Sequence, residues 1–401
     1  MNSKCKLTLV INAGSSSIKY KVFNIVNDGV IASGQCEKIG NKMGIFSLKF
    51  NKDGKQVKLE QNIPLPNHEV GISKILDELK KQNVISDFNA IKGIGHRVAM
   101  GGKLPNSCII DLKMKNYLKS LFPLAPLHNP PEVKTVETFE KILPKVKNVG
   151  VYDTSFHTTL DEVNNYPLDR KVMEKYKIRK YGMHGTSYRY ITTKMQNILH
   201  KKSINLVVCH LGNGASICEI KDNKSYNTTM GLTPLEGLMM GTRCGDVDPT
   251  VCTYLIREGY TVDQVDNLLN KESGFLGVTG ITDCRDVELA ANKGDKNAKL
   301  ALDMFVSRVA KYVVSYVNDL AKKVDAIIFT AGIGENSSFI VNKVIEKLPI
   351  LNLEIDHKLL NEKYEDFKKI SKNSSSLPIY QIHTNEELVI HQDVKKILKL
   401  I

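Results

Sequence analysis

The sequence predicts an α/β protein built from two similar domains. Two strand–turn–strand units, residues 7–23 and 204–220, lie about half a chain apart, and a third stretch, 325–348, leads from a strand through glycines into a helix. Each unit joins an apolar run to an alternating run through small turn residues, which is typical of a β-hairpin. A recurring unit indicates two related domains, each with one hairpin tip directed at a shared anion.

The first hairpin turns at residues 12–17, NAGSSS, where no bulky side chain stands. Backbone N–H groups and hydroxyls at such a tip can close around a phosphate. Lys19 and Lys21 are predicted on one face of the second strand, with Lys19 as the cation for that phosphate. An ordinary hairpin with a serine-rich turn explains this stretch alone equally well.

The second hairpin turns at residues 210–216, HLGNGAS, and has the same small-residue tip. In the third stretch, residues 325–330 form a buried-strand run, 331–336 (AGIGEN) predict a tight turn, and 337–348 predict an amphipathic helix. This order suits a nucleotide, although it matches neither G-x-G-x-x-G nor G-x-x-x-x-G-K-[ST].

Length and composition favour a globular protein of the cytoplasm. The 401 residues, 42% of them hydrophobic, are enough for two domains with cores of their own. The first six residues are polar and no apolar run approaches about 20 residues, so we expect neither a signal peptide nor a membrane span. The eight cysteines form no C-x-x-C pair, so we expect no disulfide framework and no cysteine metal site.

The charge distribution favours small anionic ligands over nucleic acid. The net charge is +13, but the lysines are spread along the chain without a basic tail or interleaved aromatics. Only 8 of the 56 cationic residues are arginine, and three of these, Arg97, Arg243 and Arg285, stand in loops with glycine, histidine or aspartate. Arginine is the better bidentate clamp for carboxylate and phosphoryl oxygens.

The rest of the sequence predicts further strands and helices and a division into two domains. We expect domains of residues 1–152 plus 388–401 and of residues 153–387. Ser187 is expected to cap a helix that ends near His200. Strands are expected within 29–59, 90–94, 149–152 and the start of 377–401. Helices are expected over 70–81 and 296–323, and further helices are expected to open at 124–131, 281–286 and 384–387.

Several polar residues at the ends of these elements allow two interpretations. Arg97 ends a strand, where ligands bind in α/β sheets, but a surface ion pair would also suit it. Asp153 and Asp283 have the spacing of helix N-caps, the latter with Arg285 as its partner. Glu386 could simply complement a helix dipole, and His128 could be a solvated loop side chain.

Nine motifs in order carry a resemblance that covers Leu9 to about Gln392: INAGSSSIK, GHRV, LAPLHNP, DTSFH, YGMHGTS, HLGNGAS, GTRCGD, AGIGEN and TNEEL. Together they resemble the acetate kinase family, within the acetate and sugar kinase, heat-shock chaperone and actin superfamily. The resemblance implies two actin-like ATPase domains of the ribonuclease H-like type with a cleft between them. It also implies a homodimer, ATP and ADP as co-substrate, and Mg²⁺ or Mn²⁺.

The resemblance implies roles residue by residue. Catalytic roles fall on Asp153, Arg97, Arg243, His184 and His128, and the acyl-substrate site on Arg97, Ala99, Leu127, Met183 and Pro234. Metal support falls on Asn12 and Glu386. ATP binding falls on Lys19, His210, Leu211, Gly212, Asn213, Gly214, Asp283, Cys284, Arg285, Gly332, Ile333, Gly334, Glu335 and Asn336.

Four positions depart from the family pattern. Met100 and Tyr188 stand where the family usually has histidine, so roles attached to those histidines do not transfer. Ala99 and Met183 replace a usual Val and Phe in the acyl pocket, which gives a smaller and more adaptable wall. We therefore expect some use of propionate, because one methylene in an apolar pocket discriminates by only about 10–200-fold.

The reaction implied is reversible, direct in-line transfer of the ATP γ-phosphoryl group to acetate, giving acetyl phosphate and ADP. Acetate, with a pKa near ~4, is already ionised, so the site needs fixed cations rather than a general base. The alternatives are a propionate or butyrate kinase of the same family, and a nucleotide-gated, actin-like binding protein. The second alternative would have no use for carboxylate-gripping arginines such as Arg97 and Arg243.

Overall fold

The computed structural model describes residues 6–126, 128–321 and 323–400. They form two compact units: the chain up to Ser155 together with the segment from Asn385 onward, and Phe156–Thr384. Each of the two boundaries between the units lies three residues from the boundary expected from the sequence. Asp153 and Glu386, expected in the second domain, therefore belong to the first unit. The backbone N–H of Asp153 donates to Val98 O (3.0 Å), which keeps this residue on the first sheet.

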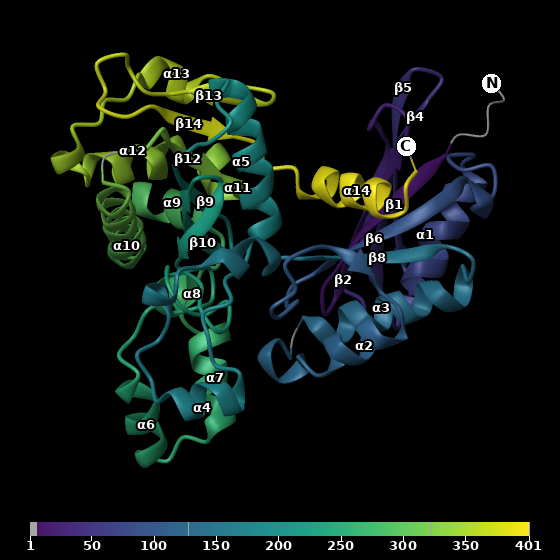
Figure 1. Cartoon of the computed structure of the whole chain (residues 1–401), viewed down its shortest axis with the longest axis horizontal. Coiled ribbons are helices and arrows are strands. Elements are labelled where there is room, and N and C mark those ends of the chain that lie inside the picture. The colour runs from purple at the N-terminus through teal and green to yellow at the C-terminus, as the bar shows by residue number, and fades with distance from the viewer. Residues whose placement is uncertain (1–5, 127, 322, 401) are drawn as a thin grey trace. The chain divides into compact units, whose positions relative to one another are not determined.

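The first unit is built on an eight-stranded mixed sheet of order β5-β4-β3-β2-β1-β6-β8-β7 (Figure 1). Strands β1 to β5 pair antiparallel, β1, β6 and β8 pair parallel, and β7 is antiparallel to β8. The strands are β1 Leu7–Ala13, β2 Ser17–Asn24, β3 Val30–Glu37, β4 Gly44–Lys52, β5 Lys55–Ile63, β6 Ile91–Val98, β7 Cys108–Ile109 and β8 Lys147–Tyr152.

Helices cover both faces of this sheet. Leu9 and Ile11 of β1 share a buried core with residues of α1 and α3, whereas Val10, on the opposite face, packs with Ile390 of α14. This alternation places α1 and α3 on one face and α14 on the other. The helices are α1 His68–Lys81, α2 Leu112–Lys119, α3 Asn129–Ile142 and α14 Glu386–Ile397, with the 3₁₀ helices η1 Phe88–Ala90 and η2 Phe122–Leu124.

The second unit repeats the strand pattern of the first. Its six-stranded sheet has the order β11-β10-β9-β12-β14-β13, with pairings that match β3-β2-β1-β6-β8-β7 one by one: two antiparallel, two parallel, one antiparallel. The repeat of the hairpins is therefore a repeat of whole sheets. The strands are β9 Leu206–Leu211, β10 Ala215–Lys221, β11 Lys224–Thr228, β12 Ala326–Thr330, β13 Phe367–Lys369 and β14 Ile379–Ile382.

Helix α5 covers one face of the second sheet, where Ile191 and Met195 pack on Val208 and Ile328. Helix α10 packs on β9 and β10. The helices are α4 Arg170–Tyr176, α5 Gly185–Leu199, α6 Thr250–Arg257, α7 Val262–Lys271, α8 Gly274–Thr279, α9 Cys284–Asn292, α10 Lys296–Asp319, α11 Ala331–Asn336, α12 Ser338–Glu346 and α13 His357–Asn361, with η3 Ser155–Thr159, η4 Glu162–Asn164 and η5 Pro349–Leu351.

Two local predictions are wrong. Residues 331–336, expected as a tight turn, form the short helix α11, which follows β12 directly because Ala331 adopts a left-handed backbone (φ 65°). Ser187 is not the N-cap of α5. That position is His184, and Ser187 lies inside the first turn with its hydroxyl bonded to His210 Nδ1 (2.9 Å).

Among the described residues, no helix combines the length and the apolar character needed to cross a bilayer.

Candidate active site

In the first unit, polar side chains gather around the guanidinium of Arg97. Its Nη2 pairs with Asp153 Oδ2 at 2.5 Å, and its Nη1 donates to Asn12 Oδ1 at 3.4 Å. Its Nε lies 3.8 Å from Glu386 Oε2, which is an ion-pair distance but too long for a hydrogen bond. Three residues predicted for the site, Asn12, Asp153 and Glu386, therefore lie close to a fourth predicted residue, Arg97.

The register of α14 on β6 explains how Glu386 reaches Arg97. Gly93 and Gly95 have no side chains, and a β-carbon on either would lie less than 3 Å from α14. The helix side chains that fill this space are Ile390, Val394 and Leu398, which continue the i, i+4 stripe begun by Glu386. Four residues of a helix rise about 6 Å and two residues of a strand rise about 6.6 Å. Every fourth residue of α14 therefore lies beside every second residue of β6, which brings Glu386 to Arg97.

The first hairpin brings two other predicted residues together. Asn12 and Lys19 are directly opposite each other in the β1–β2 register, and Lys19 is exposed. Lys21, two residues along the same face, pairs with Glu387 Oε2 of α14 at 3.1 Å. The prediction that Lys19 and Lys21 share one face of β2 is confirmed, because the alternate residues Ile18 and Tyr20 are buried on the opposite face.

Side chains from the first turn of α3 hold the chain just after Arg97. Both carboxylate oxygens of the buried Glu132 accept from the Ala99 N–H (3.1 and 3.3 Å). Asn129 accepts from the Met100 N–H (3.1 Å) and donates to the Met100 carbonyl (2.8 Å). Ala99 and Met100 are both buried. His128 is the N-cap residue of α3, and Leu127 lies outside the described residues.

Sequence reasoning missed Glu132 and Asn129. Burial raises the pKa of Glu132 to about 8, against the opposing charge of Arg97. Burial by itself would lower the pKa of Arg97, but the charges of Asp153 and Glu386 outweigh it and raise that pKa. An acid in the first turn of a helix after a proline pair was the available signal for Glu132. It is ambiguous, because such acids usually complement the helix dipole.

In the second unit, a guanidinium and an imidazole flank the second hairpin tip. A β-carbon at Gly214 would lie 3.5 Å from Arg243 Nη2 and 3.7 Å from His184 Nε2. Arg243 Nη1 donates to the Pro234 carbonyl at 2.8 Å, which ties two predicted residues directly. Burial lowers the pKa of Arg243. Arg243 pairs with no carboxylate of the described residues, whereas Arg97 pairs with Asp153.

His184 is held on two sides. Its Nδ1 lies 2.8 Å from Ser216 Oγ, and its ring stacks on that of His210 (centroids 4.1 Å apart, 18° between planes). Its backbone is left-handed (φ 59°), a conformation that costs a non-glycine residue free energy and marks functional positions more often than others. His157 Nε2 bonds the carbonyl of the buried Met183 (2.8 Å), which fixes the residue before His184.

The other predicted nucleotide-site segments surround the same tip. A β-carbon at Gly241 would lie 1.8 Å from Asn213 Oδ1 and 3.2 Å from the Thr282 carbonyl, so Gly241 lies close both to Asn213 and to the loop before Asp283. A β-carbon at Gly212 would lie 3.8 Å from the Ala331 side chain and 4.0 Å from the Gly332 N–H nitrogen. A β-carbon at Gly332 would meet no atom of the described residues within 4 Å apart from its chain neighbours and its own helix backbone.

Two predicted ligand residues have structural partners of their own. Asp283 is the N-cap of α9 and pairs with the exposed Arg285 at 2.5 Å, as the alternative interpretation had it. Glu335 Oε1 accepts from the N–H groups of Ala331 (2.8 Å) and Thr384 (3.0 Å), and its Oε2 lies 2.7 Å from His383 Nδ1. The carboxylate of Glu335 therefore braces the turn into α11.

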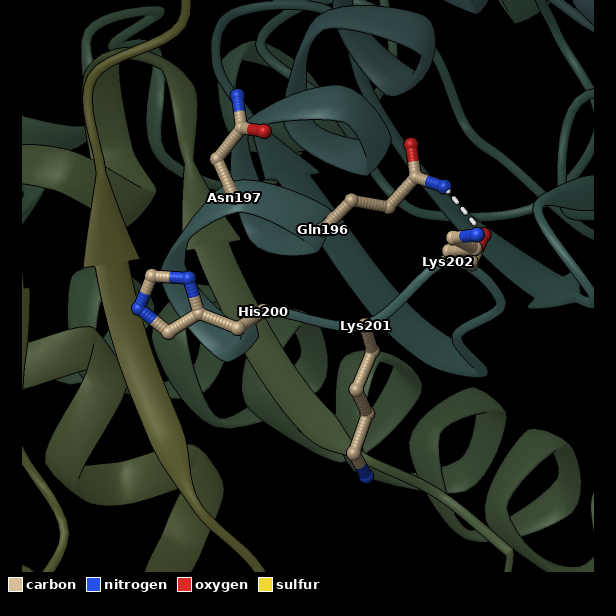
Figure 2. A pocket seen from close by; sticks show the side chains of 5 residues that line it. All are labelled: Gln196, Asn197, His200, Lys201 and Lys202. Atoms are coloured by element: carbon tan, nitrogen blue, oxygen red, sulfur yellow. Dashed lines mark hydrogen bonds between the residues drawn. The ribbon is translucent and has the colours of Figure 1, made fainter.

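A shallow surface depression of about 600 Å³ lies at the C-terminal end of α5 (Figure 2). Its lining comes from the C-terminal end of α5 and the chain beyond it: Gln196, Asn197, His200, Lys201 and Lys202. His184 stands at the opposite end of this 15-residue helix, about 22 Å away by the rise per residue. The depression therefore has no part in the site predicted from the sequence.

The oxygen donors near Arg97 have the right chemistry for Mg²⁺. No group of three or more His, Cys, Asp or Glu arranged to enclose a metal occurs among the described residues. Mg²⁺ does not need such a cage, since it keeps several waters and binds through one or two carboxylates together with substrate phosphates. The Asn12 amide oxygen and the Glu386 carboxylate fit that mode of binding.

Sequence comparison finds similar proteins over nearly the whole chain. The sequence profile of the acetokinase family matches residues 7–392. The chain is 45% identical over 393 residues to the acetate kinase of Mycoplasmoides gallisepticum, covering 98% of this chain and 99% of that protein. It is 45% identical over 401 residues to the acetate kinase of Mesoplasma florum, covering 98% and 100%.

Two solved structures are similar over nearly their full length. The propionate kinase of Francisella tularensis superposes with a TM-score of 0.91 at 37% identity, covering 98% of this chain and 99% of that one. The acetate kinase of Porphyromonas gingivalis gives a TM-score of 0.89 at 37% identity, covering 98% and 100%. The predicted fold class, two actin-like ATPase-type domains, is confirmed by these matches and by the repeated sheets.

Proposed function

The chain belongs to the acetokinase family, and from this membership and the two clusters described above we propose that it is a kinase of acetate. It transfers the γ-phosphoryl group of ATP to the acetate carboxylate, giving acetyl phosphate and ADP, and it catalyses the reverse reaction. The observation that carries the proposal is the convergence of Arg243 and His184 on the glycine tip at Gly214.

The chemistry requires positive charge and hydrogen-bond donors more than a base. Acetate is ionised at neutral pH, and the phosphoryl group passes through a metaphosphate-like transition state with charge spread over its oxygens. The obstacle is therefore the repulsion between two anions. In this proposal Arg97 and Arg243 clamp the carboxylate and phosphoryl oxygens, while His184 and His128 donate hydrogen bonds to the transferring group.

The remaining residues hold the nucleotide and orient the clamps. Asp153 fixes the Arg97 guanidinium, with which it makes its 2.5 Å contact. Lys19 and the tip from His210 through Leu211, Gly212 and Asn213 to Gly214 bind the β- and γ-phosphates. Adenosine is bound by the start of α9 and by α11, which follows β12. The residues are Asp283, Cys284, Arg285, Gly332, Ile333, Gly334, Glu335 and Asn336. In this set Glu335 shapes the turn rather than touching the base, since its carboxylate is already bonded.

Asn12 and Glu386 would hold Mg²⁺, or Mn²⁺ in its place, by way of oxygen ligands and water. The ion supplies charge neutralisation for the triphosphate. Arg97 lies within reach of both residues, so the same side chains that support the ion also hold the guanidinium that grips the substrate.

Acetate is the preferred substrate in this proposal and propionate a secondary one. The acyl pocket is assigned to Ala99, Leu127, Met183 and Pro234, of which Ala99 is small and Met183 is flexible. A similar structure is a propionate kinase, which supports some tolerance of a longer chain. An actin-like binding protein without catalysis remains the alternative from another class. The ion-paired Arg97 and the partly buried Arg243 disfavour it.

We also propose a homodimer in the cytoplasm. Exposed apolar side chains are concentrated on α4, α6 and α7 of the second unit: Val172, Tyr176, Tyr254, Ile256 and Val262. Side chains of this kind in one region of a surface mark a contact with another protein copy more often than chance.

The test is a hydroxamate assay for acyl phosphate with purified protein, ATP and acetate, propionate or butyrate. We expect ADP and acetyl phosphate in equal amounts, dependence on added Mg²⁺ or Mn²⁺, and a smaller rate with propionate. Release of inorganic phosphate without acyl phosphate, whichever acid is supplied, would contradict the proposal and favour the binding protein.

A further inference from the structure

A buried tyrosine in the second unit is connected to His184 through one serine. The hydroxyl of Tyr188 is hydrogen-bonded to Ser216 Oγ, and Ser216 Oγ lies 2.8 Å from His184 Nδ1. Tyr188 and Ser216 are both completely buried. The resemblance to the acetate kinase family puts a histidine at position 188, so this connection belongs to the present chain.

The local structure fixes this connection from two elements. His184 is the N-cap of α5, and the backbone N–H of Tyr188 donates to the His184 carbonyl (3.0 Å), which holds the two residues close together. Ser216 is the second residue of β10 and stands directly opposite His210 in the β9–β10 register. The His184 ring is thus held at one edge by Ser216 and over one face by His210, whose Nδ1 bonds Ser187 of the same helix.

The other ring nitrogen points toward the proposed phosphate site. His184 Nε2 and Arg243 Nη2 lie within 3.7 Å of the position that a β-carbon at Gly214 would take. A phosphoryl oxygen at that tip needs a donor, and a neutral imidazole can donate from Nε2 only when its proton is on Nε2.

The direction of the hydrogen bonds follows from the chemistry of the two hydroxyls. A phenol is more acidic than an aliphatic alcohol and is therefore the better donor, so Tyr188 donates to Ser216. Ser216 then uses its own single proton to donate to Nδ1, which must be unprotonated. This order leaves the imidazole proton on Nε2.

We propose that Tyr188, acting through Ser216, is a positioning residue that holds His184 as the Nε2–H tautomer facing the glycine tip. The inference rests on the proposed function for its kinetic consequence, but the tautomer itself can be measured without substrate. It also accounts for the replacement of the family histidine, since a phenol supplies the same single donor.

The test compares Tyr188→Phe with Tyr316→Phe. Tyr316 is also buried in the second unit, and its hydroxyl has no hydrogen-bond partner among the described residues. This control therefore removes a buried phenol hydroxyl without breaking a hydrogen bond. In ¹⁵N-histidine NMR spectra of the ligand-free protein, assigned with a His184→Gln variant, we expect pyridine-type Nδ1 and pyrrole-type Nε2 for His184. We expect this pattern to persist in Tyr316→Phe and to become a mixture of tautomers in Tyr188→Phe.

Kinetics give the second readout. We expect Tyr188→Phe to lower kcat by about 10- to 100-fold, as misorientation of a reacting group does, with KM for ATP and acetate close to that of the control. Tyr188→His should restore most of kcat, and Ser216→Ala should reproduce the defect if Tyr188→Phe folds poorly. A wild-type spectrum with the proton on Nδ1, or a Tyr188→Phe variant that matches Tyr316→Phe in both tautomer and kcat, would overturn the inference. Absence of acyl phosphate formation by the wild type would instead contradict the proposed function and leave the NMR test valid.

Discussion

Replacing Gly95 with alanine should reduce activity by displacing Glu386, which it does not touch. The new β-carbon would lie 2.4 Å from Ile390 Cγ2 and 2.8 Å from Val394 Cγ2. Carbon atoms pack at about 3.5–4.0 Å, so α14 or its side chains must retreat by about 1 Å. Glu386 is one helical turn from Ile390 on the same stripe, so the carboxylate near Arg97 moves with the helix.

Two magnitudes follow from this displacement. Overpacking of a tight contact costs about 1–3 kcal/mol of unfolding free energy. A shift of about 1 Å in a group that organises the site can cost about 10²-fold in rate. We expect the loss in kcat/KM to be accompanied by a higher Mg²⁺ requirement, because Glu386 is one of the two residues proposed to support the ion.

The assay is steady-state kinetics at varied Mg²⁺ together with urea unfolding. Gly71→Ala in α1 is the matched control, because its β-carbon would meet Ile18 and Cys36 at ordinary distances of 3.5 and 3.6 Å. That substitution should leave the kinetics unchanged and stabilise the helix by about 0.5–1 kcal/mol. A Gly95→Ala enzyme with wild-type kinetics and Mg²⁺ dependence would refute the claim that the α14 register places Glu386.

Three further predictions concern the arginine clamp, the acyl pocket and a buried acid. Arg243→Ala should lower kcat by about 10³-fold or more, as loss of such an arginine does, and near-full turnover would exclude its assignment. The kcat/KM for propionate should stay within about 200-fold of that for acetate, and a larger gap would mean a rigid pocket. Burial and the charge of Asp319 raise the pKa of Glu219 from 4.5 to about 8, and its carboxylate has no partner among the described residues. The folded state therefore binds more protons than the unfolded state between these values, and stability falls as pH rises through them. Measured by chemical denaturation, the unfolding free energy of Glu219→Gln relative to the wild type should rise by about 1.4 kcal/mol per pH unit between pH 4.5 and about 8. A difference that does not change with pH would contradict the raised pKa of Glu219.

The hairpins and long helices could be predicted from the sequence because their signals are local. Alternation in Lys19–Phe23 and small residues at 12–17 determine a hairpin within one stretch of chain. The helix expected over 296–323 is found as α10, Lys296–Asp319. Short segments rich in glycine were less predictable. In 331–336 the helix depends on a left-handed Ala331 and on the Glu335 carboxylate bonding its N–H, which propensity alone does not indicate.

The environment of Arg97 could be predicted only in part. The motifs named Asn12, Asp153 and Glu386, but the contacts between them depend on β6 pairing with β1 and on α14 seating on two glycines. Glu132 and Ser216 were missed for the same reason. Their roles come from partners that are distant in sequence, Ala99 and His184. Glu132 stands in an ordinary helix start, and Ser216 stands in the HLGNGAS motif, which does not indicate a partner for its hydroxyl.

Direct transfer between ATP and the carboxylate is the central claim, and the stereochemistry at phosphorus tests it. ATP made chiral at the γ-phosphorus should yield acetyl phosphate with inverted configuration, because a single in-line displacement inverts that centre. Retention of configuration would require two displacements through a phosphorylated protein group, and it would contradict the proposed direct transfer.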